Sequence, residues 1–295
     1  MDISQQITER MEHINQILCE YLPKEEGFQK TIFEAMNYSI MAGGKRLRPM
    51  LMEETFKMFG GTSEVIKPFM AAIEMIHTYS LVHDDLPAMD NDEYRRGKKT
   101  THAVYGEAMG ILAGDALLNY AYETAVKAFG IEPQNERLGK ALSVLSRKSG
   151  VYGMVGGQVV DVESAGCNLS KEKLDFIYEL KTSALIESSM MIGAILAGAK
   201  EEDIKAVEKI AKNVGIAFQI QDDILDVTST VEELGKPIHS DDKNEKTTYL
   251  TLVGLEKAKE YVEKISMEAV ELLAGFDTKD SFLEELLKAL IHRKK

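Results

Sequence analysis

Two clusters of aspartate each close an apolar stretch of the chain. The first lies in HDDLPAMDND at 83–92 and the second in QIQDDILD at 219–226. Several carboxylates packed together repel one another unless protons or cations offset their charge. Mg²⁺ commonly binds through one or two carboxylates, several water molecules and the phosphates of a substrate. The two clusters therefore indicate metal binding by carboxylate together with phosphate.

Helical spacing brings the carboxylates of each cluster together. Asp222 and Asp226 are four residues apart and share one helix face, with Gln219 beside them. In the first cluster a proline cannot continue a regular helix, so we expect the chain to loosen and bring Asp90 back toward Asp84. One Asp pair near a helix end is usually a solvated cap, but two such clusters are harder to explain in that way.

Basic residues flank the aspartates in a chain of formal net charge −13. Arginine binds phosphate oxygens with paired hydrogen bonds, so the set favours a polyanionic ligand bridged to metal, although a solvated face explains any one member. His77 lies two helical turns before Asp84, where a lone histidine is more often a packed polar residue than a ligand. The basic candidates are Lys45, Arg46, Arg48, Arg95, Arg96, Lys181, Lys236 and Lys246.

Composition and missing motifs exclude several classes of function. The chain of 295 residues is 44% hydrophobic and 28% charged, which is typical of a globular protein. The acidic excess argues against broad nucleic-acid binding, which needs a basic face. The sequence contains no GxxxxGK[ST], GxGxxG, HExxH or GxSxG motif. Nucleotide hydrolysis, dehydrogenase chemistry, zinc proteolysis and serine hydrolysis therefore have no support.

The sequence also indicates a cytoplasmic location. Cys19 and Cys167 form no CxxC pair, which fits a reducing compartment. The amino-terminal segment lacks the apolar core of a secretory signal. The longest uncharged runs, 149–160 and 188–199, are too short to cross a bilayer, which takes about 20 apolar residues.

The elements that must position these residues are helices. Apolar residues recur at spacings of three and four, for example in 71–85 and 204–226, and only six prolines interrupt the chain. Strand-like alternation is nearly absent. We therefore predict an all-α bundle of about ten or more helices. No linker or repeat divides the chain, so we expect a single domain over 1–295.

Six segments carry a resemblance to a known family. They are GGKRLRP (43–49), EMIHTYSLVHDDLPAMDNDEYRRGKKTTH (74–102), GEAMGILAGDALL (106–118), GMVGGQVVD (153–161), KTSALI (181–186) and FQIQDDILDV (218–227). Over essentially its whole length the chain resembles the trans-isoprenyl diphosphate synthases, most closely those of the bacterial farnesyl type. The resemblance implies an all-helical fold around a deep central cavity.

The resemblance also implies three Mg²⁺ ions in the active site. Asp84 and Asp90 would bind two of them, with Asp85 in support. Asp222 would hold the third, with Asp223 and Asp226 acting largely through water. The residues implied in catalysis are Asp84, Asp85, Lys181, Asp222 and Lys236.

Two diphosphate sites follow from the same resemblance. The residues matching the allylic diphosphate site are Arg95, Lys181, Thr182, Gln219 and Lys236, with Lys246 joining them. The residues matching the isopentenyl diphosphate site are Lys45, Arg48, His77 and Arg96. One departure is His239, where the family leads us to expect glycine, and it puts the closure of a connecting segment in doubt more than the chemistry.

The implied reaction joins isopentenyl diphosphate to an allylic diphosphate, first dimethylallyl and then geranyl, to give farnesyl diphosphate. Tyr79 lies five residues before Asp84, where a bulky ring would limit chain growth, although most aromatic residues of helices simply fill the core. Spacing alone leaves the product open between C15 and C20, and the resemblance favours C15. The resemblance also implies a homodimer. The apolar helix at 107–129 is a candidate for the dimer contact, although a place in the core of a single chain explains this helix equally well.

Several other functions are weighed against this one. A geranylgeranyl diphosphate synthase of the same family is the main alternative. A non-catalytic subunit of a heteromeric synthase usually loses an Asp-rich motif, and both motifs are intact here. A terpene cyclase typically lacks the isopentenyl site that GGKRLRP implies, and a helical scaffold leaves both clusters unexplained.

Overall fold

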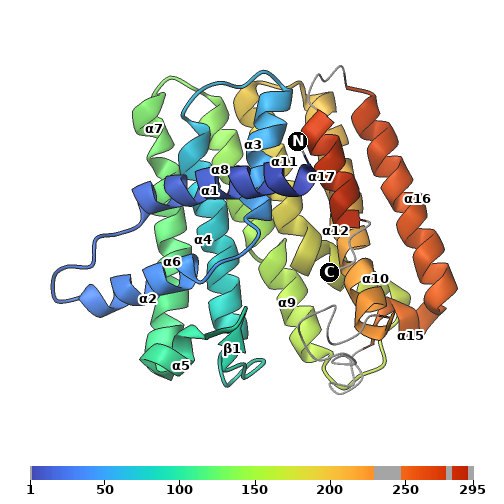
Figure 1. The fold of residues 1–295 in the computed structure, drawn as a ribbon, viewed down its shortest axis with the longest axis horizontal. Helices are drawn as coiled ribbons and strands as arrows, with labels where there is room; N and C mark the ends of the chain where they lie inside the picture. Colours follow the sequence, from blue (N-terminus) through green and yellow to red (C-terminus); the bar gives the residue numbers. More distant parts are fainter. Residues whose placement is uncertain (1, 229–246, 277–280, 292–295) are drawn as a thin grey trace. The chain divides into compact units, whose positions relative to one another are not determined.

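The computed structural model describes residues 2–228, 247–276 and 281–291 (Figure 1). These residues are mostly helical, which confirms the all-α prediction. More than ten helices occur among the described residues, in agreement with the predicted number of about ten or more. The chain forms two compact units: unit 1 is Met1–Glu53 with Thr62–Leu142, and unit 2 is Glu54–Gly61 with Ser143–Lys295. The two units do not test whether the chain forms one domain, so the single domain over 1–295 stays a prediction.

Unit 1 is built around helix α4. Its own elements are α1 (Ile3–Tyr21), α2 (Lys30–Met41), α4 (Ile66–Asp84), β1 (Tyr94–Arg95), β2 (Lys98–Lys99), α5 (Thr101–Tyr105), α6 (Glu107–Val126) and α7 (Ala128–Ile131). Helix α6 runs beside α4, and α1 and α2 also pack against α4 (Figure 1). A helix that is apolar on all sides must be buried on all sides, and α4 is buried along nearly its whole length. The first aspartate cluster therefore begins at the end of a fixed core helix.

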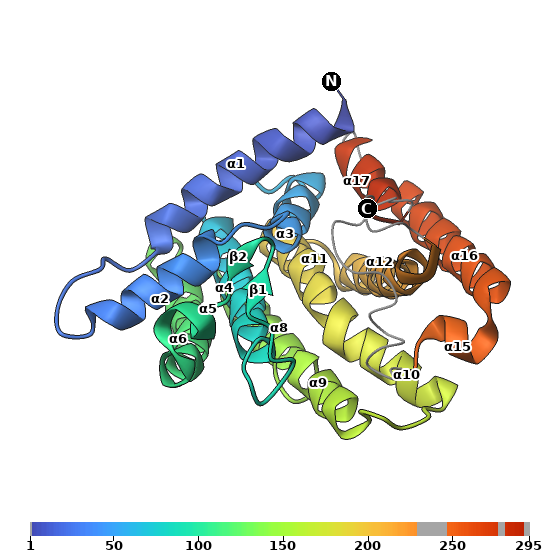
Figure 2. The same cartoon turned by 60° about the horizontal axis from the view of Figure 1, so that its bottom comes forward.

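Unit 2 is built around helices α11 and α12. Its own elements are α9 (Met154–Glu163), α10 (Lys171–Ile177), the π-helix η1 (Tyr178–Ser183), α11 (Ala184–Ala197), α12 (Glu201–Thr228), α15 (Tyr249–Val253), α16 (Leu255–Ala274) and α17 (Ser281–Ile291). Helices α3 (Leu47–Met58) and α8 (Arg137–Ser149) contribute residues to both units. Helix α12 packs against α11, η1 and α16 (Figure 2). It carries the second aspartate cluster in its last two turns.

Helices α10, η1 and α11 follow one another without a break in the chain (Figure 2). This run, Lys171–Ala197, is long and apolar enough to cross a membrane, and it is the one such segment among the described residues. However, 78% of its most apolar window is buried inside the protein. A core helix passes the same test of length and composition, so the run is weak evidence for a membrane span.

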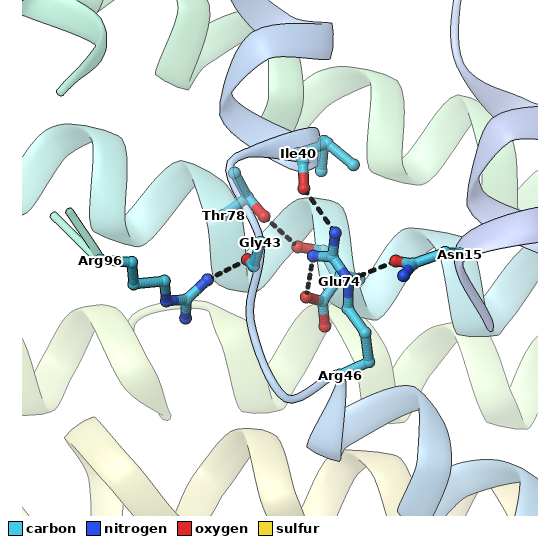
Figure 3. A network of polar contacts seen from close by, with 7 residues as sticks. All are labelled: Asn15, Ile40, Gly43, Arg46, Glu74, Thr78 and Arg96. Atoms are coloured by element: carbon cyan, nitrogen blue, oxygen red, sulfur yellow. Dashed lines mark hydrogen bonds and ion pairs between the residues drawn. The ribbon is translucent and has the colours of Figure 1, made fainter. Parts of the chain in front are cut away.

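A buried ion pair holds the connection between α2 and α3 against α4 (Figure 3). Arg46 is only 3% exposed, and its Nη1 lies 2.7 Å from Oε1 of Glu74 on α4. Its Nε donates to Oδ1 of Asn15 at 2.8 Å, and its Nη2 donates to the carbonyl of Ile40 at 2.7 Å. All three guanidinium nitrogens therefore bind inside the protein. This corrects the grouping of Arg46 with the phosphate-binding cations.

Replacing Glu74 with glutamine should destabilise the protein strongly. The variant leaves the Arg46 charge buried without its counter-charge, which costs about 3–5 kcal/mol of unfolding free energy. Urea unfolding of the wild type and Glu74→Gln measures the difference. The matched control is Glu34→Gln, which breaks the exposed pair with Lys30 and should cost less than about 1 kcal/mol. Equal losses in the two variants would contradict the structural role of the buried pair.

Candidate active site

The first aspartate cluster folds back onto the end of α4. The backbone N–H of Asp90 donates to the carbonyl of Asp84 at 2.9 Å, and that of Asp92 donates to the carbonyl of Asp85 at 3.2 Å. These bonds satisfy carbonyl groups that a helix end leaves without intrahelical donors. The prediction that the chain returns Asp90 toward Asp84 is thereby confirmed. The side chain of Asp84 is half-buried and that of Asp90 is exposed.

The second aspartate of this cluster holds an arginine in place. Asp85 is 3% exposed, and its Oδ1 accepts a hydrogen bond from Nε of Arg95 at 2.8 Å, with Nη2 at 2.7 Å. Burial raises the pKa of Asp85, while the guanidinium of Arg95 opposes that shift. Because Arg95 approaches one carboxylate oxygen with two nitrogens, the orientation of its side chain is well defined. The supporting role expected of Asp85 thus includes orienting Arg95, a residue predicted to bind the allylic diphosphate.

A short hairpin presents Arg95 and its neighbour. Strands β1 and β2 pair antiparallel through Arg95 and Lys98, and the two turn residues, Arg96 and Gly97, have φ of 53° and 75°. Two positive φ values are typical of a type I′ turn. The guanidinium of Arg96 donates to the carbonyl of Gly43, and a Cβ on Gly44 would lie 2.4 Å from its Nη1. Glycine at 44 is therefore required for the approach of Arg96.

Basic groups in unit 1 lie close enough to perturb one another. Burial lowers the pKa of Arg48 to about 10, with Glu74 opposing the shift and Arg96 adding to it. The pKa of His77 lies well below its usual value because of burial, and then because of Arg48, Arg96, Arg95 and Arg46 in that order. An anion that binds here would relieve this repulsion. Four residues are predicted to bind isopentenyl diphosphate. Three of them, Arg48, His77 and Arg96, lie close enough for their charges to shift pKa values within the group. The fourth, Lys45, is exposed.

Unit 2 places a second set of predicted residues on the π-helix. Nζ of Lys181 lies 2.5 Å from Oδ2 of Asp161, and the hydroxyl of Thr182 donates to Oε1 of Gln219 at 2.9 Å. π-Helical turns inside α-helices frequently occur at functional sites. Sequence reasoning gave no role to Asp161, although it lies in the quoted GMVGGQVVD segment. Its position one helical turn after Gly157 is the signal that could have identified it.

Two glycines allow neighbouring helices to approach this π-helix closely. A Cβ on Gly157 of α9 would lie 2.4 Å from the backbone nitrogen of Lys181. A Cβ on Gly215 of α12 would lie 2.4 Å from Oγ of Ser183. Real Cβ atoms do not make contacts this short, so only glycine fits at either position. The backbone carrying Lys181 and Thr182 is consequently held from two sides within unit 2.

The second aspartate cluster contains one half-buried and two buried carboxylates. Asp222 is half-buried, whereas Asp223 is 4% exposed and Asp226 is 5% exposed. Oδ2 of Asp223 accepts hydrogen bonds from the hydroxyl of Tyr178 at 2.5 Å and from the backbone N–H of Tyr249 at 3.0 Å. Asp223 is expected to act largely through water, and protein donors occupy this one of its two oxygens.

The metal site itself stays a prediction. No group of three His, Cys, Asp or Glu side chains within the described ranges could hold a metal ion. Mg²⁺ sites that rely on one or two carboxylates and substrate phosphates need no such group. The carboxylates of Asp84, Asp90 and Asp222 offer the oxygen ligands that Mg²⁺ prefers. Lys236, His239 and Lys246 lie outside the described residues.

The predicted floor residue, Tyr79, is buried within unit 1. It is 6% exposed, and burial raises the pKa of its hydroxyl to about 12. Its ring meets that of His83 edge-on, with centroids 5.9 Å apart. His83 is held in turn by α6, because its Nε2 lies 3.1 Å from the carbonyl of Ile111. A Cβ on Gly114 of α6 would lie 2.0 Å from the same Nε2, so the glycine makes room for this ring.

The lowered pKa of His77 predicts a pH dependence of stability. Its folded pKa is lowered, so below about pH 6.5 the unfolded chain binds more protons than the folded chain. The free energy of unfolding should therefore fall as the pH falls from 6.5, by up to about 1.4 kcal/mol per pH unit from this group. Urea unfolding at several pH values measures the slope. His77→Gln should make it shallower, and an unchanged slope would refute the assignment.

The chain is similar to known proteins over most of its length. Residues 29–289 match the polyprenyl synthetase family. The chain is 49% identical over 250 residues to a chloroplastic geranylgeranyl pyrophosphate synthase of Catharanthus roseus, covering 83% of this chain and 69% of that protein. A solved FPP/GFPP synthase from Zymomonas mobilis matches with a TM-score of 0.85 and 32% identity over 99% of both chains.

A second solved structure is the geranyltransferase from Helicobacter pylori complexed with magnesium and isoprenyl diphosphate. It matches with a TM-score of 0.82 and 31% identity, over 99% of this chain and 97% of that one. The extent of these matches exceeds what a shared fold alone requires. The chain therefore belongs to the polyprenyl synthetase family, a family of prenyltransferases.

Proposed function

We propose that the chain is a Mg²⁺-dependent prenyltransferase that condenses isopentenyl diphosphate with dimethylallyl and then geranyl diphosphate. The products are (2E,6E)-farnesyl diphosphate and diphosphate. The proposal rests on two features of unit 1. Arginines lie close enough to His77 to lower its pKa, and the first aspartate cluster folds back on the end of α4. A metal-bridged diphosphate satisfies both kinds of charge at once.

The residues of each site have distinct tasks in this reaction. Lys45, Arg48, His77 and Arg96 bind the diphosphate of isopentenyl diphosphate. Arg95, which Asp85 orients, binds the allylic diphosphate. The resemblance adds Lys181, Thr182 and Gln219 to the residues that bind this diphosphate. Lys236 and Lys246, outside the described residues, complete the allylic set by resemblance.

The metal ions are held by Asp84, Asp90 and Asp222 in this proposal. Bound Mg²⁺ supplies Lewis-acid stabilisation of the negative charge that develops on the leaving diphosphate. Arg95 and Lys181 add hydrogen bonds that strengthen as that charge grows, so they contribute most in the transition state. Support for magnesium comes from the oxygen-only ligand set and from the Helicobacter pylori structure, which contains magnesium.

The allylic carbon–oxygen bond breaks first, and the double bond of isopentenyl diphosphate then attacks the allylic cation. The adduct loses a proton to the released diphosphate, since the sequence contains no conspicuous side-chain base. Water would capture the cation, so the site must exclude water while the cation exists. The cations around His77 keep the attacking substrate in place during this step.

Product length rests on Tyr79. A buried tyrosine braced by His83 forms a floor that stops growth at fifteen carbons. The second candidate product is geranylgeranyl diphosphate, and it is favoured by the name of the Catharanthus roseus relative. The two products differ in the space they need. A C20 chain needs the room that the Tyr79 ring fills, whereas a C15 chain ends above this ring.

We further infer a cytoplasmic homodimer. The exposed cysteines, Cys19 and Cys167, fit a reducing compartment. Helix α6 carries Ile111 at 43% and Leu112 at 53% exposure, and a second copy of the chain would cover these apolar side chains. A non-catalytic subunit is disfavoured because both aspartate clusters are intact.

Incubation with isopentenyl diphosphate, dimethylallyl diphosphate and Mg²⁺ should yield prenyl diphosphates detectable by mass spectrometry. EDTA should abolish turnover, and Mg²⁺ or Mn²⁺ should restore it, because hard cations suit oxygen ligands. Asp84→Ala and Asp222→Ala should each lower kcat by roughly 10³-fold or more, since they remove transition-state charge stabilisation. Unchanged helical circular dichroism is the control, and full activity in excess chelator would refute the mechanism.

Truncating the floor should lengthen the product. Tyr79→Ala removes the ring beneath the growing chain, so the main product should shift from C15 to C20 or longer. Chain-length analysis of the extracted products measures this shift. Tyr79→Phe keeps the ring and should keep the wild-type product. The floor assignment is wrong if Tyr79→Ala leaves the product unchanged or if the wild type already makes chiefly C20.

A further inference from the structure

One ridge of α12 runs along the π-helix that carries Lys181 and Thr182. Gly215, Gln219 and Asp223 follow one another at intervals of four residues, so they lie on one face of the helix. Each of them meets η1. Gly215 gives room for Ser183, Gln219 accepts from Thr182, and Asp223 accepts from Tyr178.

The bond between Asp223 and Tyr178 fixes the first residue of η1. Tyr178 begins the π-helix, is 7% exposed and donates its hydroxyl proton to Oδ2 of Asp223 at 2.5 Å. A π-helical turn is otherwise an uncommon conformation. The Tyr178 bond and the Thr182 bond thus hold η1 near both of its ends.

The same carboxylate oxygen also holds the beginning of α15. The backbone N–H of Tyr249, the first residue of α15, donates to Oδ2 of Asp223 at 3.0 Å. Thr248 forms a capping box with Thr251, and the Tyr249 ring stacks on Tyr261 with centroids 5.4 Å apart. One buried oxygen therefore joins η1, α12 and α15.

The neighbouring aspartate has a different environment. Adjacent residues of an α-helix point about 100° apart, so Asp222 cannot share the ridge that faces η1. Asp222 is half-buried, whereas Asp223 is almost completely buried. We propose that the two members of the Asp pair divide the work: Asp222 binds metal, and Asp223 is a positioning residue that holds Tyr178 and thereby the segment bearing Lys181 and Thr182. This inference rests on the proposed function for the roles of Asp222, Lys181 and Thr182.

Three variants separate positioning from metal binding. Asp223→Asn keeps an oxygen that can accept from Tyr178 but removes the charge. Asp223→Ala removes the acceptor, and Tyr178→Phe removes only the donor hydroxyl and keeps the aromatic ring. Asp222→Asn is the matched control, because it makes the same chemical change one residue earlier in the same helix.

Hydrogen–deuterium exchange of the metal-free protein gives a readout that needs no catalysis. Amides of Tyr178–Ser183 should exchange at least ~10-fold faster in Asp223→Ala and Tyr178→Phe, because local opening becomes easier. They should stay near wild type in Asp223→Asn and Asp222→Asn. Protection that is unchanged in Tyr178→Phe would overturn the proposal. This single-atom change keeps the test independent of whether Asp223→Ala folds.

Kinetics supply the second readout. The Mg²⁺ concentration for half-maximal turnover should rise at least ~10-fold in Asp222→Asn and stay within ~2-fold in Asp223→Asn, since metal affinity follows its ligands. Tyr178→Phe and Asp223→Ala should raise KM for geranyl diphosphate, and their double variant should lose less than the product of the single losses. An equal Mg²⁺ shift in Asp223→Asn and Asp222→Asn would overturn the proposal. A wild type without prenyltransferase activity would refute the proposed function instead, and the exchange result would still stand.

Discussion

Like charges must be brought together before any ligand arrives, and this constraint governs the structure. A site for a diphosphate gathers cations, and a site for metal gathers carboxylates, so each set repels itself in the unliganded protein. Buried opposite charges hold members of these sets in place. Asp85 holds Arg95, and Glu74 holds Arg46 so that the loop bearing Lys45 is fixed. Such pairs add little net stability themselves, but breaking one leaves a buried charge without compensation.

Backbone geometry provides the second part of the arrangement. The Arg96 side chain reaches the 43–44 backbone because a type I′ turn directs it there and because Gly44 has no side chain. In unit 2, Gly157 and Gly215 let α9 and α12 approach η1 closely. The functional side chains are therefore placed mainly by small residues and unusual turns near them, while the long apolar helices supply rigid support.

Much of the fold was accessible from sequence because its signals are local. Apolar spacing predicts the helices, and a proline after an Asp pair predicts the returning loop that joins Asp90 to Asp84. The role of Arg46 was not accessible, since an arginine in GGKRLRP looks the same whether it meets a phosphate or a buried glutamate. The π-helix and the bonds of Asp223 depend on contacts distant in sequence, which spacing along one segment does not encode.

We propose that the carboxylates of the two aspartate clusters are of two kinds, those that bind metal and those that hold neighbouring side chains. A crystal structure of the chain with Mg²⁺, isopentenyl diphosphate and an unreactive allylic diphosphate tests this most directly. We expect metal ions ligated by Asp84, Asp90 and Asp222, with Arg95 still bound to Asp85 and Tyr178 still bound to Asp223. Metal ligated by Asp223 in place of its bond to Tyr178, or a diphosphate bound away from Arg95 and Lys181, would contradict it.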